Sequence, residues 1–198
     1  QKCSPFSVYF SAWALVLHKL SAKNHFVIAT VDANRRHPQL QSCVGFIANT
    51  LALPVDIQAG ATLGQQVKSF HQSIQQAHQF ADVPFELIVG PLLSSDVATL
   101  LEVAIHYVDA PLESNYRVGN LKVEKLNLSN NHAKYPLSLN IVDGDRPELS
   151  LQYDEHQYPK AFIQHIGHYF TRVLQAIAED ATEVAKLSLF NNEEMHSL

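Results

Sequence analysis

The sequence predicts an α/β fold in which one mixed β-sheet is flanked by helices. The segment 26-FVIATV-31 has the short, β-branched and nearly all-apolar composition of a strand that is covered on both faces. The segment 136-PLSLNIVDGDRPELSLQYD-154 has the pattern of a β-hairpin, with Asp143-Gly144-Asp145 in its turn. Other segments repeat apolar residues at three- and four-residue steps, which is the period of an amphipathic helix. Strands and helices therefore share one sheet-based domain.

Length and composition fit one domain over residues 1–198. A chain of 198 residues with 46% hydrophobic and 17% charged residues can bury about 70% of its unfolded surface. The net charge of -5 is scattered, so we expect neither nucleic acid nor an anionic membrane as a partner. No apolar run reaches the ~18 residues of a membrane span. Cys3 and Cys43 are the only cysteines, which indicates reduced thiols in a cytoplasmic protein.

Two long helices in the first half begin with recognisable capping residues. Ser4 supplies a capping hydroxyl and Pro5 a first-turn proline, and this helix runs to about residue 20 with apolar residues on more than one face. Thr62 and Gln65 have the spacing of a capping box that opens a helix to about residue 80. We expect the first helix to be wedged between other elements.

The 82-DVPFE-86 segment allows two interpretations. It is either a paired-carboxylate acid–base site or a structural unit in which Asp82 caps a short helix, Phe85 anchors it in the core and Glu86 complements its dipole. The structural interpretation is favoured.

The remaining elements are strands and a final helix. Strands are predicted over Leu100–Val108 and Leu121–Leu126, and Pro159 opens a long helix with one wide apolar face laid on the sheet.

The stretch 44-VGFIANTLALPVDI-57 has the pattern of a second apolar strand with unexpected polar residues inside it. Pro54 limits it to an edge or a bulge. Asn49 and Thr50 either face a polar channel or satisfy local backbone groups at a strand bend. Gly45 permits another backbone to approach closely.

Several of these segments together resemble the condensation domain of nonribosomal peptide synthetases, specifically its C-terminal lobe. The resemblance rests on the Gly-Phe-x-x-Asn-Thr and Asp-x-Pro-Phe-Glu patterns and on the order of the segments that carry and surround them: 30-TVDANRRHPQL-40, 44-VGFIANTLALPVDI-57, 78-HQFADVPFELIV-89 and the Gln152-Tyr153-Asp154 strand end before Pro159. It covers nearly the whole chain.

The resemblance implies a chloramphenicol-acetyltransferase-like fold of two lobes, with a channel between them for two carrier-bound thioesters. The implied reaction is amide bond formation. The implied partners are the N-terminal lobe, peptidyl carrier proteins and an adjacent adenylation domain. No cofactor is bound directly, because the substrates are carried on phosphopantetheine arms. The family's His-His-x-x-x-Asp-Gly motif belongs to the N-terminal lobe and is absent from this sequence. We therefore assign no catalytic residue and expect the isolated lobe to be inactive.

Five residues are candidates for the substrate channel or lobe junction: Asn34, Arg35, Gly45, Asn49 and Thr50. Asn34 and Arg35 follow a strand end, where α/β proteins often place ligand contacts. Arg35 or Arg36 is a candidate for a phosphopantetheine phosphate. The alternative is a solvated charge or the partner of a nearby carboxylate.

Some features depart from the family pattern or argue against an independent active site. Phe80 and Ala81 stand where the family usually has histidine and glutamine, and 94-SSDVATLL-101 replaces its Arg-Asx segment. His165 and His168 share a helix side without evident further ligands, so no metal site is assigned. Cys43 has no activating neighbour.

The polar stretch Asn115–Tyr135 corresponds to the family's bridging loop, and we expect it to pack poorly here. Two alternatives to a synthetase lobe remain open. One is a non-catalytic module that docks a carrier protein or serves as a scaffold. The other is an acyltransferase of the same fold that builds its channel by oligomerising.

Overall fold

The computed structural model describes residues 3–90, 101–109, 116–123, 133–180 and 182–190. Five strands form the main sheet in the order β2-β1-β3-β6-β7: β1 His25–Asp32, β2 Asn49–Asp56, β3 Val103–Val108, β6 Leu137–Val142 and β7 Glu148–Tyr153. β1 is parallel to β3, and β3 is parallel to β6, whereas β2 and β7 run antiparallel to their neighbours at the two edges. The predicted mixed sheet is therefore confirmed.

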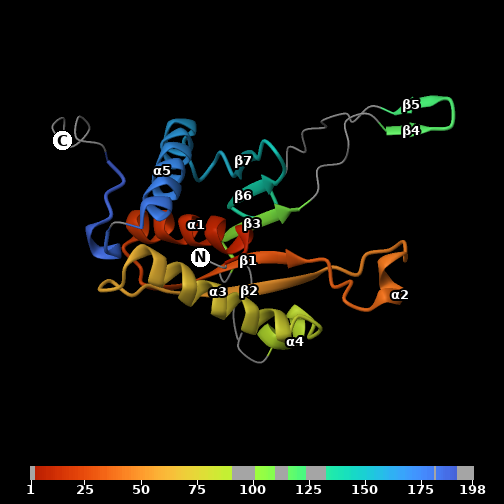
Figure 1. The fold of residues 1–198 in the computed structure, drawn as a ribbon, viewed down its shortest axis with the longest axis horizontal. Coiled ribbons are helices and arrows are strands. Elements are labelled where there is room, and N and C mark those ends of the chain that lie inside the picture. Colours follow the sequence, from red (N-terminus) through yellow and green to blue (C-terminus); the bar gives the residue numbers. More distant parts are fainter. Residues whose placement is uncertain (1–2, 91–100, 110–115, 124–132, 181, 191–198) are drawn as a thin grey trace.

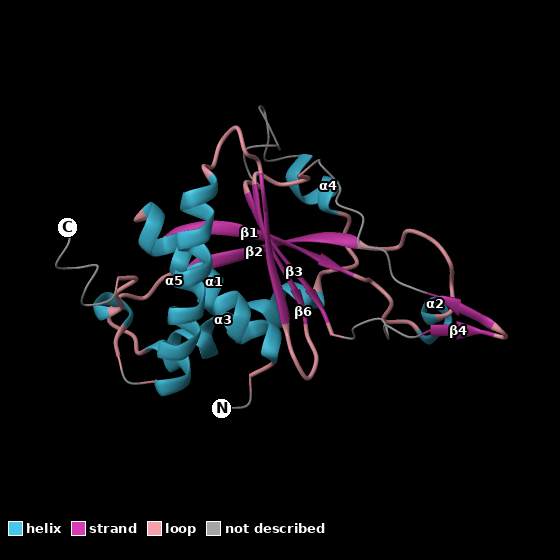
Figure 2. Cartoon of the chain, turned by 90° about the horizontal axis from the view of Figure 1, so that it is seen from above, coloured by secondary structure: helices cyan, strands magenta, loops and turns pink. Residues whose placement is uncertain are grey.

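The longer helices gather on one face of this sheet, as Figure 1 and Figure 2 show: α1 Pro5–Ser21, α3 Leu63–Gln79 and α5 Lys160–Glu179. Shorter helices are α2 Pro38–Gln41, α4 Phe85–Val89 and the 3₁₀ turn η3 Val184–Lys186. None of the helices in the described ranges combines the length and apolar character that a bilayer-spanning segment needs.

α1 lies at the centre of the core. The Ser4 hydroxyl accepts from the Ser7 amide at 3.2 Å and Pro5 begins the helix, as predicted. Its buried residues surround the helix, and Trp13 meets Phe170 of α5 edge-on, with ring centroids 6.3 Å apart. α1 is thus wedged between the sheet and the other helices.

α3 and α5 complete the helical layer. Thr62 and Gln65 form the predicted capping box at the start of α3. α5 follows Pro159 and buries Ile163, Ile166 and the residues that continue this stripe. It packs along α1, and Phe162 and Ile166 of its apolar face line one cleft together with residues of β1, β3 and β6.

The alternation of side chains in the strands defines the two faces of the sheet. On the helical face of β2, Leu51, Leu53 and Val55 are buried. On the other face, the small side chains of Ala29 and Ala104 pack under Tyr135, while Val31 remains exposed. The second face therefore carries only a small apolar cluster within the described residues.

The predicted strand 44–57 is shorter in the structure, because β2 begins at Asn49. Residues before it leave the sheet, and α2 forms inside the polar segment 32–42. β2 is an edge strand, as Pro54 indicated.

We predicted that Asp82 caps α4, and this prediction is wrong. The helix begins at Phe85 with Pro84 in the capping position and no side-chain cap. Phe85 is buried and Glu86 lies in the first turn, so these two predictions are confirmed. Gly90 follows the last residue of the helix in the C-cap position.

A separate two-stranded ribbon lies between β3 and β6 in the chain. β4 Tyr116–Val118 and β5 Leu121–Val123 pair antiparallel and join no other described strand. Both views place this ribbon and α2 beyond the same end of the main sheet (Figure 1, Figure 2). The predicted strand Leu121–Leu126 is present as far as Val123, and its last residues lie outside the described ranges, as does the start of the predicted strand Leu100–Val108. The rest of the predicted bridging segment is described only in part, so its packing stays a prediction.

Candidate functional site

The candidate site begins where β1 ends, at Asp32. One Asp32 carboxylate oxygen accepts from the Asn34 amide at 2.6 Å, which closes a tight turn. Asn34 itself has a left-handed backbone with φ 52°, a conformation that asparagine tolerates well. Asn34 thus shapes the turn that leads away from the sheet.

Arg35 holds the following segment together through backbone carbonyls. Its guanidinium donates to the carbonyl oxygens of Leu40, of Cys43 at 2.7 Å and of Gly45 at 3.2 Å. These bonds tie Arg35, which precedes α2, to carbonyls near and after the end of α2. The geometry shows a structural function for Arg35 that the sequence did not suggest, and its contact with a phosphate stays a prediction.

Arg36 matches the carboxylate-partner alternative. Its guanidinium lies 3.3 Å from the Asp32 carboxylate. The pair is partly exposed, so we expect it to contribute little by itself.

The segment held by Arg35 presents apolar side chains to solvent. Val44 is fully exposed and Phe46 is 94% exposed. A Cβ added at Gly45 would meet no other atom within 4 Å, so Gly45 makes no close backbone approach in this structure. The surface formed by Val44 and Phe46 is therefore available to another chain or lobe.

Asn49 uses its amide on backbone groups. Its Nδ2 donates to the carbonyl oxygens of Ala81 at 2.8 Å and Val83 at 2.7 Å, and its Oδ1 accepts from the Phe85 amide at 3.3 Å. These contacts match the alternative interpretation, in which Asn49 satisfies backbone groups, although those groups lie more than 30 positions away. Thr50 follows on the opposite face of β2, half-buried, and pairs with Val31. The contribution of both residues to a channel stays a prediction.

Asp32 also joins β1 to α3. His78 Nδ1 lies 2.7 Å from the second carboxylate oxygen, and the Asp32 side chain is only 12% exposed. Burial raises the pKa of Asp32, but the Asn34 amide, the His78 imidazole and the Arg36 guanidinium together hold that pKa below its ordinary value. Asp32 is thus a charged anchor at the carboxyl end of β1.

A cleft of about 520 Å³ lies beside this anchor, lined by residues of α1, β1, α3 and β3. Tyr107 lies at its β3 side and donates a short hydrogen bond to Asp143. Burial, this hydrogen bond and the nearby carboxylates raise the pKa of Tyr107, so its hydroxyl stays protonated. The cleft therefore combines an ionised carboxylate with aromatic and aliphatic walls.

Neither the histidines nor the serines of this region form an accessible catalytic pair. His71 Nδ1 lies 2.8 Å from the Ser7 hydroxyl, but Ser7 is fully buried and also contacts Ser4. A substrate carbonyl cannot reach such a serine. On α5, His165 stacks on Tyr169, and within the described residues no group of three potential metal ligands converges.

Three features were missed at the sequence level. The Asp32–His78 contact links residues 46 positions apart, so no local pattern indicates it. The Tyr107–Asp143 contact likewise depends on the parallel pairing of β3 with β6. The β4–β5 ribbon did carry a local signal, because Gly119 and Asn120 form a two-residue hairpin turn in which Gly119 has a positive φ of 59°.

Comparison with known proteins extends over the whole chain. A family model described as "Condensation domain" matches residues 1–198. The chain is 28% identical over 194 residues to "Malpinin synthetase" of Mortierella alpina, covering 96% of this chain and 2% of that protein. It is 27% identical over 202 residues to "Phosphinothricin tripeptide synthetase PhsC" of Streptomyces viridochromogenes, covering 98% of this chain and 18% of that protein. The chain thus spans a small part of these relatives.

Solved structures share the fold. A four-domain nonribosomal peptide synthetase bound to AMP and glycine superposes with a TM-score of 0.86 at 18% identity, covering 97% of this chain and 16% of that one. The starter condensation domain of rhizomide synthetase RzmA superposes with a TM-score of 0.73 at 17% identity, covering 93% of this chain and 44% of that one. The complex of the X-domain and OxyB from teicoplanin biosynthesis superposes with a TM-score of 0.81 at 16% identity, covering 97% of this chain and 44% of that one. The α/β architecture is therefore that of condensation domains, the chloramphenicol-acetyltransferase-like fold.

Proposed function

Because the chain belongs to the condensation domain family of nonribosomal peptide synthetases, we propose that it is the C-terminal lobe of such a domain. The supporting observation is a coverage asymmetry: 93% of this chain aligns with only 44% of the starter condensation domain chain. A single lobe of a two-lobe domain has this relationship to the whole. The order of the motifs along the sequence supports the C-terminal half.

In the complete domain, the reaction is amide bond formation between two thioesters held on phosphopantetheine arms of carrier proteins. The acceptor amine attacks the donor thioester carbonyl, so the site has to position both arms, manage the amine proton and stabilise the oxyanion. The sequence lacks the family's His-His-x-x-x-Asp-Gly motif. This chain therefore supplies a wall of the channel, and alone it is inactive.

The junction with the N-terminal lobe lies at the carboxyl end of the sheet. The exposed Val44 and Phe46 face it, and Arg35 holds their segment in position. Gly45 leaves room there for the other lobe, and Asn34 directs the chain toward it. Asn49 and Thr50 begin β2 at this same end.

Carrier proteins, an adenylation domain and the N-terminal lobe are the proposed partners, and the cytoplasm is the proposed location. The phosphopantetheine arms come with the carrier proteins. This chain is not proposed to hold a cofactor of its own.

The test is reconstitution with an N-terminal lobe. The reading frame upstream is first examined for His-His-x-x-x-Asp-Gly. That lobe is then produced separately and mixed with this chain and with aminoacyl-loaded carrier proteins, and the dipeptidyl thioester is measured by mass spectrometry. Product is expected only when both lobes are present, and replacing the second motif histidine by alanine should abolish it.

A variant of this chain makes the test specific for the junction. Phe46→Asp places a charge in the proposed lobe contact and should weaken reconstitution at least about tenfold. The exposed Glu155→Gln, in the turn after β7 at the opposite end of the sheet, is the control. Equal product yields for the two variants would contradict the junction.

A second candidate is a non-catalytic docking or scaffold module. It is favoured by the structural relative that was solved as a complex of an X-domain with OxyB. Under this alternative, an upstream lobe without an intact histidine motif would still associate with this chain, but no amide would form. Association is measured by analytical ultracentrifugation, so it is scored separately from chemistry.

A further inference from the structure

A second cleft lies at the opposite end of the sheet, where the parallel strands β1, β3 and β6 begin. It has a volume of about 420 Å³, within the usual range of small-molecule sites, and lies between the end of α1 and the start of α5. Most of its wall is apolar and comes from residues of five elements: Leu17, Phe26, Val103, Leu137, Phe162 and Ile166. It shares no lining residue with the cleft beside Asp32.

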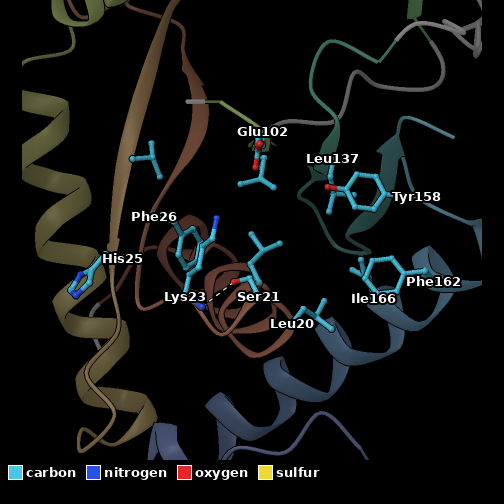
Figure 3. A pocket seen from close by; sticks show the side chains of 13 residues that line it. Leu20, Ser21, Lys23, His25, Phe26, Glu102, Leu137, Tyr158, Phe162 and Ile166 are labelled. Carbon is cyan, nitrogen blue, oxygen red and sulfur yellow. Dashed lines mark hydrogen bonds between the residues drawn. The ribbon is translucent and has the colours of Figure 1, made fainter. Parts of the chain in front are cut away.

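Among the polar residues that line this cleft are Lys23, Glu102 and Tyr158. Figure 3 shows Lys23 beside Phe26 on one side, Glu102 above, and Tyr158 with Phe162 on the other side. The Tyr158 hydroxyl is turned toward the cleft in this view. Within the described part of the chain, the Lys23 ammonium, the Glu102 carboxylate and the Tyr158 hydroxyl make no hydrogen bond or ion pair. A cation, an anion and a hydroxyl donor are therefore available to one ligand.

Local structure positions the Lys23 backbone and the Tyr158 ring. After α1, Ala22 adopts a left-handed backbone with φ 56°, and the Lys23 amide donates to the Ser21 hydroxyl at 3.3 Å (Figure 3). On the other side, the Tyr158 ring stacks on Phe162, with centroids 6.2 Å apart and planes 9° apart. Pre-positioned groups lower the entropy that a ligand loses on binding.

Tyr158 is a hydrogen-bond donor at neutral pH. Burial, the Glu102 carboxylate and the Asp154 carboxylate all raise the pKa of the Tyr158 phenol. His25, by contrast, does not contribute, because its imidazole pairs with Asp56 at 3.0 Å and points away from the cleft (Figure 3).

We propose that this cleft binds a free α-amino acid with an aromatic or branched aliphatic side chain. The ligand ammonium pairs with Glu102, and the ligand carboxylate pairs with Lys23 and accepts from the Tyr158 hydroxyl. The side chain enters the space between Phe26 and Phe162. A bound fatty acid would place its own carboxylate beside the like-charged Glu102, and a bound amine would place its own ammonium beside the like-charged Lys23. A zwitterion carries one charge opposite to each residue and therefore fits both.

The first test uses L-phenylalanine and two analogues that each lack one charge. Calorimetry and protein-observed NMR of the 198-residue chain should give a dissociation constant on the order of 1 mM for phenylalanine, as expected for a ligand of this size. Phenethylamine and 3-phenylpropionate should each bind several-fold more weakly. The proposal would be overturned if phenylalanine did not bind at a concentration ten times the expected dissociation constant. It would also be overturned if either analogue bound as tightly as phenylalanine or more tightly.

The second test uses variants of the two exposed charges. Glu102→Gln and Lys23→Gln should each raise the phenylalanine dissociation constant about two- to fivefold, the effect of losing one solvent-exposed ion pair. The matched control is Lys186→Gln, which removes a lysine from a surface pair with Glu183. An unchanged constant in both cleft variants would overturn the assigned charges. The site does not depend on the proposed lobe function, and binding is measured without carrier proteins, so the two ideas fail separately.

Discussion

At the scale of single residues, two amide side chains hold backbone segments that belong to different elements. Asn49 binds the carbonyl oxygens of the chain before α4. Gln66 is fully buried, and its side chain donates to the Asp56 carbonyl at 2.9 Å and accepts from the Gln58 amide at 2.8 Å. Each amide satisfies groups that would otherwise lose their hydrogen bonds on burial. These polar residues therefore stabilise connections between elements.

Replacing Asn49 by alanine is expected to destabilise the protein by about 1–3 kcal/mol, because two carbonyls and one amide lose their partner. The measurement is urea unfolding followed by the fluorescence of Trp13, the only tryptophan and a buried one. Thr50→Val is the neighbouring control, which keeps the shape of the side chain. If Asn49→Ala lowered the free energy of unfolding no more than the control does, this structural function would be contradicted.

Asp32 predicts a dependence of stability on pH. The folded state lowers the pKa of Asp32 below its ordinary value of 3.8, so the stabilisation is present above that value and is lost as the pH falls through the lowered folded pKa. Asp32→Asn should therefore be less stable than the parent near neutral pH, and the difference should shrink below about pH 4. Urea unfolding from neutral pH down to about pH 3 measures this, with Asp145→Asn as control. A difference that does not change with pH would contradict the assignment.

At the scale of elements, the segment between β1 and β2 depends on one side chain. Arg35 contacts the carbonyl of Leu40 in α2 and the carbonyls of Cys43 and Gly45 in the segment that leads from α2 to β2, and α2 itself has only four residues and no side-chain cap. Helices this short are not stable by themselves. The segment therefore keeps its shape through Arg35.

Arg35→Ala should accelerate cleavage by chymotrypsin at the exposed Phe46 at least about threefold, because local opening becomes less costly. Initial cleavage rates under native conditions, read by mass spectrometry, measure this. Arg36→Ala removes a neighbouring charge while leaving the carbonyl contacts intact, and it should change the rate much less. Equal rates for the two variants would show that the carbonyl contacts do not order the segment.

Elements also show which parts of the structure the sequence could predict. The starts of α1 and α3 were predicted because the capping partners of Ser4 and Thr62 lie three residues away. The cap assigned to Asp82 was wrong because the amide of Phe85, the first residue of α4, donates to Asn49, more than 30 residues earlier in the chain. In the candidate site, a local pattern selected Asn34, whereas the Asp32–His78 contact arises only when α3 packs beside β1.

At the scale of the whole molecule, the described structure consists of one packed body and a projecting ribbon. Sheet and helices share a continuous core, whereas β4 and β5 pair only with each other among the described strands. Together with α2, the ribbon extends past the carboxyl end of the sheet (Figure 1). The body should therefore fold independently of the ribbon.

Replacing Tyr116–Val123 with a Gly-Ser segment of equal length is expected to change the free energy of unfolding by less than about 0.5 kcal/mol. Leu139→Ala, in the buried middle of β6, is the reference and should cost about 2–5 kcal/mol. Both are measured by urea unfolding. A loss for the ribbon replacement comparable to that of the reference would show that the ribbon is part of the cooperative unit.

The place of the ribbon in the chain has a mechanical consequence. It is inserted between β3 and β6, which are direct neighbours in the interior of the sheet and are joined by parallel pairing over six residue pairs. A partner that binds the ribbon would pull on these two interior strands and not on an edge strand, which separates from its sheet more easily.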